Sequence, residues 1–182
     1  LGERVMLVER FDGGFPDDRE APGPTLAATA TLAEVARWFR FDLAESRRRF
    51  RVNLEIGDGE AFWEDTLATP ARPGLGAEAA GLAADLPADP YADLPPPEPR
   101  ALTIGPVQLR AANVCRRCVV PSRDSRTGAI TVNFRDAFEA RRTRSLRADV
   151  DASGWSHAYR LAINTIGLTS GLITLGDPCA TR

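Results

Sequence analysis

A chain of 182 residues that is 43% hydrophobic and 26% charged is long enough for one globular domain with a core. Its net charge of −2 and its short apolar runs argue against a nucleic-acid binder driven by overall charge and against a membrane span. Three cysteines are too few for a disulfide scaffold and no secretory signal is visible, so we expect free thiols and a cytoplasmic location. Because the first residue is Leu1 rather than Met, we expect the chain to be part of a longer protein.

The first part of the chain predicts two strands and a helix. Residues 3–10 read as a strand, and a loop rich in Gly, Pro and Asp follows. A helix is expected over 31–40, with Thr31 as the N-cap of a capping box that Glu34 completes. The next segment predicts a strand with one apolar and one polar face, in which Phe50, Val52, Leu54 and Ile56 alternate with Arg51, Asn53 and Glu55.

The second part predicts mostly strands. Residues 71–100 hold seven of the 14 prolines and five acidic side chains, so we expect a weakly ordered insertion there. A β-hairpin is expected over 101–114, around the turn Gly105-Pro106. Further strands are expected over 118–120, 129–133, 158–166 and 171–177, and a helix capped by Asn133 over 134–146. Many short strands with two helices favour a β-rich, barrel-like domain.

Two of the cysteines, Cys115 and Cys118, form a C-x-x-C pair in a basic setting, "CRRCVVPSRD". A thiolate is the form that acts as nucleophile or metal ligand, and neighbouring arginines favour it. Three other readings remain open: half of a structural Cys₃His zinc site with Cys179 and His157, a dithiol redox pair, or two buried core residues. If the backbone is extended here, Cys115 and Cys118 point to opposite sides.

Four motifs in order give the chain a resemblance to a known family. They are "RFRVN" (49–53), "WED" (63–65), "CRRCVVPSRDSRTG" (115–128) and "GLITLGDP" (171–178), and "FPD" (15–17) also fits. Together they resemble the MOSC domain, which ends molybdenum-cofactor sulfurases and forms the C-terminal part of the mitochondrial amidoxime-reducing component and its bacterial relatives. The resemblance covers most of residues 10–178. It implies a mainly β fold built around a distorted closed barrel with two or more short helices, and one domain over 1–182.

The resemblance also implies roles for particular residues. Cys118 matches the family's molybdenum ligand, and Arg51 and Asn53 match the F-R-x-N pair that contacts the pterin. Asp17 matches an aspartate near the metal, while Arg116 and Arg117 fall where the cofactor is contacted. Glu64 and Asp65 also match a family motif, and we expect them to be structural, holding Arg51 or a turn.

The implied activity is a two-electron reduction of small N-hydroxylated or N-oxygenated compounds by a molybdenum–pterin cofactor. No haem, flavin or iron–sulfur motif is visible, so the electrons would come from a separate donor protein. The chain departs from the family because it lacks the N-terminal β-barrel module and carries the insertion at 71–100. Two alternatives therefore stay open: a sulfur-carrier or cofactor-binding module that uses a Cys118 persulfide, and a non-enzymatic domain with the Cys/His zinc site.

Overall fold

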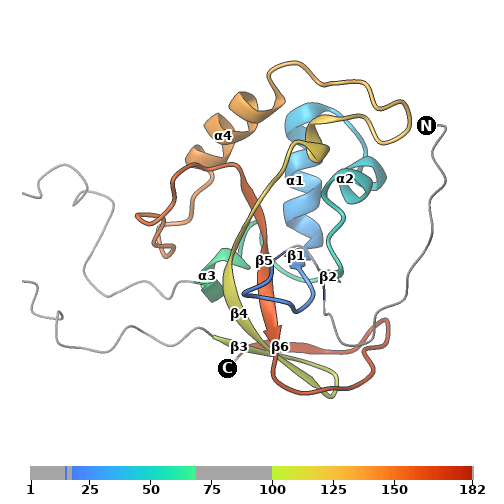
Figure 1. Ribbon diagram of the computed structural model, residues 1–182, viewed down its shortest axis with the longest axis vertical. Coiled ribbons are helices and arrows are strands. Elements are labelled where there is room, and N and C mark those ends of the chain that lie inside the picture. Colours follow the sequence, from blue (N-terminus) through green and yellow to red (C-terminus); the bar gives the residue numbers. More distant parts are fainter. Residues whose placement is uncertain (1–14, 16–17, 69–99, 182) are drawn as a thin grey trace, which may run out of the picture.

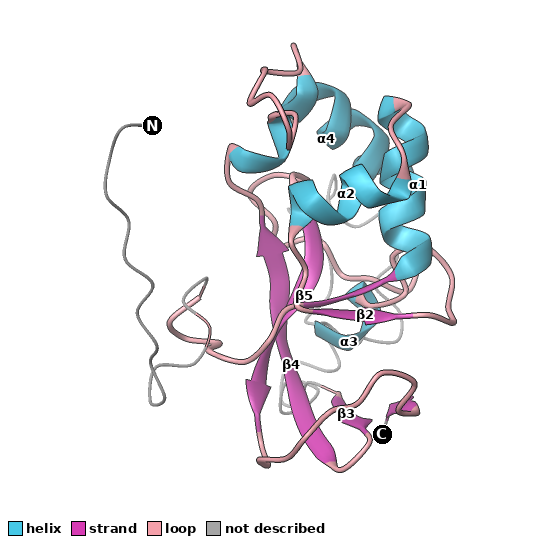
Figure 2. Ribbon diagram, turned by 90° about the vertical axis from the view of Figure 1, so that its right-hand side faces the viewer, coloured by secondary structure: helices cyan, strands magenta, loops and turns pink. Residues whose placement is uncertain are grey.

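The structure is a computed structural model, and it describes residues 15, 18–68 and 100–181. A six-stranded, nearly closed, barrel-like sheet forms its centre, with the strand order β2-β1-β5-β4-β3-β6 (Figures 1 and 2). The strands are β1 (Leu26–Ala28), β2 (Leu54–Ile56), β3 (Ala101–Ile104), β4 (Val107–Arg116), β5 (Arg160–Gly167) and β6 (Cys179–Thr181). The helices are α1 (Thr29–Phe39), α2 (Leu43–Phe50), α3 (Asp65–Ala68), α4 (Phe134–Arg144) and the short 3₁₀ helix η2 (Val120–Ser122). The expected mainly β, barrel-like fold class with short helices is confirmed.

Strand pairing is antiparallel except at one edge of the sheet. β1 and β2 are parallel, and α1 and α2 form the crossover that joins them. Helices α1, α2 and α4 gather at one end of the molecule, while the hairpin β3–β4 and the segment before β6 lie at the other end (Figure 1). The long, paired strands β4 and β5 run between these two ends and so link the helical end of the molecule to the hairpin end.

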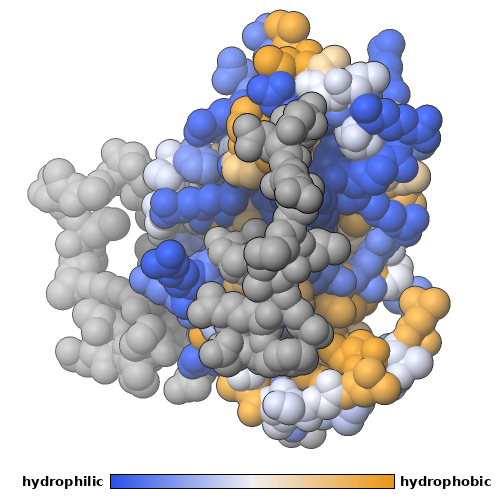
Figure 3. Space-filling model, turned by 45° about the vertical axis from the view of Figure 1, so that its right-hand side comes forward, coloured by the Kyte–Doolittle hydropathy of each residue, from blue (hydrophilic) through white to orange (hydrophobic). Residues whose placement is uncertain are grey.

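Two apolar clusters fill the interior. One joins the helices to the sheet and is largely aromatic: the rings of Phe50, Phe134, Phe138 and Tyr159 contact one another within it. The other lies among the strands and is aliphatic, with Leu26, Leu102, Leu109 and Ile163 buried. At the end away from the helices some hydrophobic residues stay exposed, and Figure 3 shows them gathered at the lower edge of one face; Leu168, Leu172 and Leu175 belong to this exposed set.

The strand expected over residues 50–56 is confirmed only for its last three residues. Phe50 is the last residue of α2, Arg51 follows in the left-handed conformation with φ 48°, and the strand is confined to Leu54–Ile56. Asp42 caps α2 by accepting a hydrogen bond from the backbone N–H of Glu45. The buried residues of α2 recur at helical spacing, so Phe50 belongs to a period of 3.6 that the period-2 pattern concealed.

The expected start of the first helix also needs correction. α1 begins at Thr29, directly after the short strand β1 that the sequence did not reveal, and no side chain caps it. Thr31 is buried, and its hydroxyl donates to Glu64 Oε2 at 2.9 Å and accepts from the backbone N–H of Phe62. Thr31 therefore ties α1 to the segment before α3 rather than closing a capping box with Glu34.

Three expected strands in the second half are wrong or displaced. β4 ends at Arg116, and residues 118–120 lead into η2, because Pro121 has no N–H for a ladder. Residues 129–133 form only an isolated bridge, between Ile130 and Arg123. Residues 171–177 form a loop, and the last strand is β6 instead.

Other expectations are confirmed. The hairpin turns at Gly105-Pro106, where Gly105 has a φ of 52°, and β5 covers the strand expected over 158–166. The helix expected over 134–146 is α4, although the Asn133 side chain makes no capping bond. The strand expected over 3–10 and nearly all of the insertion at 71–100 lie outside the described residues. In the described part of the chain, no helix has the length and apolar character that crossing a membrane requires.

Candidate functional site

The two cysteines of the C-x-x-C pair lie in different environments, although the backbone is not extended beyond Arg116 as the expectation assumed. Register shifts in the β4–β5 pairing interrupt the alternation of β4, so that Val114 and Cys115 are both buried. Cys115 is 7% exposed, whereas Cys118, two residues beyond the end of β4, is exposed. The Cys118 thiol is therefore open to a ligand, and the Cys115 thiol is part of the interior.

Arg117 connects the cysteine segment to the end of α2. Its guanidinium donates to Cys115 Sγ at 3.3 Å and to the carbonyl oxygen of Phe50, and it also lies 5.7 Å from the centre of the Phe50 ring. The motifs "RFRVN" and "CRRC", more than 60 residues apart in the chain, are therefore in direct contact. Arg117 remains a predicted cofactor residue, although its Nη atoms already bind protein atoms.

Tyr159 lies close enough to Cys118 and Arg117 for their charges to act on it. Burial raises the pKa of Tyr159 to about 12, while the charge of Arg117 opposes that rise and Cys118 adds to it. The Tyr159 side chain is 3% exposed, and its hydroxyl has no hydrogen-bond partner among the described residues. A buried hydroxyl without a partner is uncommon in proteins, so Tyr159 Oη stands out as an unsatisfied polar atom of the aromatic cluster.

The loop that follows Cys118 is clamped to α2 by a buried ion pair. Glu45 accepts hydrogen bonds from Ser125 and from Arg49 Nε, the latter at 2.7 Å. Arg49 also donates to the carbonyl of Pro121 and to Thr131 at the two ends of the loop. Burial alone would raise the pKa of Glu45, but the Ser125 and arginine hydrogen bonds bring it to about 2. The loop is therefore fixed by a charged pair that sequence spacing did not disclose.

A row of polar side chains crosses four neighbouring strands close to the end of β4 that leads to the cysteines. In the strand register Asn113 of β4 lies opposite Asn164 of β5. Thr25, directly before β1, comes next in the row, and Asn53, directly before β2, ends it. Thr25 donates to Asn53 Oδ1 through both its backbone N–H and its hydroxyl, and Asn164 Nδ2 donates to Asn113 Oδ1 at 3.0 Å. We call Asn53, Thr25, Asn164 and Asn113 the polar row.

Asp18 closes one end of the polar row. Its carboxylate accepts hydrogen bonds from Asn113 and Asn164, and the Asn113 bond is the main reason that the pKa of Asp18 is lowered. Asn164 is 4% exposed, yet its Oδ1 atom has no partner among the described residues. Asp17, the aspartate that the family resemblance singled out, lies outside the described residues, and its neighbour Asp18 is the acidic group that the structure places here.

The remaining predicted residues lie around this region on the surface. Asn53 belongs to the polar row, and Arg51 is exposed directly after Phe50, whose carbonyl binds Arg117. Arg116 is exposed on β4, and in the strand register it lies opposite Arg160 of β5. Neither Arg51 nor Arg116 forms an ion pair with a residue that the structure describes. Arg51 and Asn53 do not share one strand as expected, because the chain between α2 and β2 is not extended throughout.

Glu64 and Asp65 are buried away from Arg51. Asp65 pairs with the fully buried Arg142 of α4, and Glu64 accepts the hydroxyl of Thr31. Burial and the neighbouring Asp65 raise the pKa of Glu64 to about 8. Their expected structural role agrees with this placement, but their partners are Thr31 and Arg142 instead of Arg51.

The zinc alternative finds no support in this geometry. Its four ligands, Cys115, Cys118, His157 and Cys179, are all described, but no three His, Cys, Asp or Glu side chains in the described ranges are grouped so that they could hold a metal ion.

The sequence motifs predict only part of this site. Cys118 and Asn53 follow from the motifs, whereas Tyr159, Asp18, Asn113 and Asn164 carry no motif and come together only through strand register. Comparison with models of known protein families gave no match for the chain, and a search of curated proteins gave none either. The exposed thiol, the arginines without an ion pair to a described residue and the partly satisfied polar row therefore rest on the structure alone.

Proposed function

We propose that this chain is a molybdenum-cofactor-binding domain in which Cys118 is the protein ligand of the metal, and that it serves the reduction of small N-oxygenated compounds. The observation that carries the proposal is the separation of the two cysteines, with Cys118 exposed and Cys115 buried. A soft thiolate suits a molybdenum centre that already carries pterin sulfurs.

The residues present fit such a group. A pterin offers N–H donors and a carbonyl acceptor, and the polar row offers amide and hydroxyl groups together with the Asp18 carboxylate. Asn164 Oδ1, a buried atom of the polar row, has no partner among the described residues and could be satisfied by a bound polar ligand.

The cofactor, when bound, would supply the two-electron redox chemistry. The protein side chains would hold and orient it: Asn53, Asn113 and Asp18 through hydrogen bonds, and Arg51 and Arg116 through charge-assisted bonds to its phosphate. The clamp of Glu45 and Arg49 would keep the loop after Cys118 in one position. Electrons would come from a separate donor protein.

A second candidate uses the same thiol without a redox reaction at a metal. In a sulfur carrier Cys118 would carry a persulfide, and its exposure favours this role equally well because transfer needs access by another protein. Cys115 and Cys118 are both free thiols, and the burial of Cys115 would protect a Cys118 persulfide from attack by its neighbour, which suits a persulfide that must persist.

Elemental and sulfur analysis of the protein distinguishes the two. The chain would be purified from a host that makes molybdenum cofactor, and molybdenum, oxidised-pterin fluorescence, sulfane sulfur and zinc would be measured per chain. Molybdenum and pterin in equal amounts support the first candidate. Sulfane sulfur without molybdenum supports the second, and zinc alone refutes both.

A further inference from the structure

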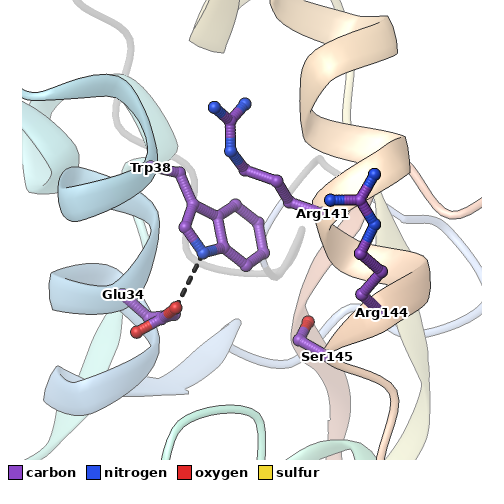
Figure 4. A pocket seen from close by; sticks show the side chains of 5 residues that line it. All are labelled: Glu34, Trp38, Arg141, Arg144 and Ser145. Atoms are coloured by element: carbon purple, nitrogen blue, oxygen red, sulfur yellow. Dashed lines mark hydrogen bonds between the residues drawn. The ribbon is translucent and has the colours of Figure 1, made fainter.

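A pocket of about 310 Å³ lies between α1 and α4, apart from the candidate site just described. Glu34 and Trp38 of α1 form one wall, and Arg141, Arg144 and Ser145 at the end of α4 form the other (Figure 4). Its volume falls at the lower end of the range for small-molecule sites. Its residues belong to no motif of the family resemblance.

The pocket carries an excess of positive charge. Both oxygens of Glu34 are engaged, one by the indole N–H of Trp38 at 2.7 Å and the other by Arg37. Neither Arg141 nor Arg144 forms an ion pair with any residue in the described ranges. The one carboxylate of the pocket is therefore already neutralised, while two guanidinium groups are not.

Contacts within the protein hold Arg141 and Trp38 in place. The guanidinium of Arg141 lies 5.4 Å from the centre of the Phe39 ring on α1 and donates to the Ala137 carbonyl. Trp38 stacks on Phe62, with ring centres 5.5 Å apart, and meets Phe138 edge-on. Arg141 and Trp38 are thus ordered before any ligand arrives, which lowers the entropy cost of binding.

A simpler explanation for Arg141 and Arg144 is that their positive charges interact favourably with the dipole of α4 near its C-terminus. That role does not require a hollow between two helices or a Trp ring beside the cations. Figure 4 shows the Arg141 side chain reaching from α4 toward α1, with its guanidinium close to the Trp38 indole, while the Arg144 guanidinium stays beside α4.

We propose that this pocket binds a small organic phosphate whose planar part lies against Trp38. Two guanidinium groups from successive helical turns offer many N–H donors that point in several directions. A planar carboxylate has only two oxygens to accept them, so it cannot use them all. A phosphate monoester has three terminal oxygens and close to two negative charges at neutral pH, so it matches both arginines. The indole ring offers an aromatic ligand a flat surface.

The test titrates phenyl phosphate into the ¹⁵N-labelled protein and follows the three indole N–H resonances, with a Trp38→Phe variant to assign that of Trp38. We expect a saturable shift confined to the Trp38 resonance. In the double variant R141Q/R144Q the dissociation constant should rise about tenfold or more, because two charge-assisted bonds are lost. Arg135→Gln is the matched control, since Arg135 lies on the same helix but pairs with Glu139, and it should leave the affinity unchanged.

Two results would overturn the proposal: no saturable shift of the Trp38 resonance, or an equal affinity in R141Q/R144Q and wild type. Unchanged dispersion of the remaining amide resonances shows that each variant is folded. The measurement needs no molybdenum, so its failure would leave the proposed role of Cys118 unaffected.

Discussion

The environment of Glu64 leads to a specific prediction about pH, because its side chain is fully buried and forms no ion pair with a residue that the structure describes. Thr31 donates to one of its oxygens, and the other oxygen has no partner in the described part of the chain. Its pKa is about 8 in the folded protein against an ordinary value of 4.5. The folded state therefore prefers the neutral acid, whereas the unfolded state ionises readily.

The sign follows from this raised pKa. The contribution of Glu64 to stability is fully present below pH 4.5 and is lost as the pH rises toward 8, because the folded state then holds a proton that the unfolded state has released. Each pH unit in that interval costs up to about 1.4 kcal/mol. From pH 5 to pH 8 the free energy of unfolding should therefore lose about 3–4 kcal/mol through this one group.

Glu64→Gln tests this reasoning, because glutamine is neutral at every pH and nearly the same shape. Urea unfolding at pH 5, 6, 7 and 8 should give a difference between wild type and variant that grows in favour of the variant by about 3 kcal/mol across the range. His157, whose lowered pKa makes stability rise near pH 6.5, is present in both proteins and cancels. Glu60→Gln is the control, since Glu60 is exposed on the same loop. A difference that stays constant from pH 5 to pH 8 would refute a protonated Glu64.

Two further substitutions test the structure that positions the site. Glu45→Gln leaves the buried Arg49 with only its longer ion pair, to Asp124 Oδ2 at 3.6 Å, so we expect about 3 kcal/mol of destabilisation by urea unfolding and faster hydrogen exchange in residues 119–131; unchanged exchange there would mean that the Glu45–Arg49 pair does not hold the loop. Gly23→Ala places a Cβ 2.5 Å from the Thr165 carbonyl oxygen, so we expect about 1–3 kcal/mol of destabilisation, while Gly154→Ala, with no atom within 4 Å, should cost less than about 1 kcal/mol. Equal costs for the two glycine variants would contradict the close approach of this segment to β5.

Local patterns predicted the parts of the fold that depend on near neighbours. The hairpin β3–β4 follows from alternation around a Gly-Pro turn, and α4 follows from helical spacing after Asn133. α2 was hidden because its polar face is rich in arginine and its buried residues include Glu45 and Arg49, which count as polar in any hydrophobic pattern. Their burial depends on each other across one helical turn and on Ser125, which is 80 residues away.

The site shows the same division. The expected separation of Cys115 and Cys118 agrees with their burial and exposure, but not for the expected reason: β4 ends at Arg116, and a register shift rather than strict alternation leaves Cys115 buried. The pairing of Asn113 with Asn164 could not be predicted, because a polar residue in a strand gives no sign of which neighbour it will face. Asn113 and Asn164 are brought together only by the register of β4 against β5, and the Asp18 carboxylate accepts a hydrogen bond from each of them.

The proposed function depends most directly on the difference between the two cysteines. Cys118→Ser and Cys115→Ser would be purified beside wild type from a host that makes molybdenum cofactor, and molybdenum per chain and the melting temperature would be measured for each. We expect Cys118→Ser to lose the metal and keep the wild-type melting temperature, because a serine oxygen is a poor match for the centre and this side chain is exposed. Cys115→Ser should keep the metal and melt at a lower temperature, because it places a hydroxyl in the interior beside Arg117. Molybdenum retained in full by Cys118→Ser, or lost equally from both variants, would contradict the assignment of Cys118 as the ligand.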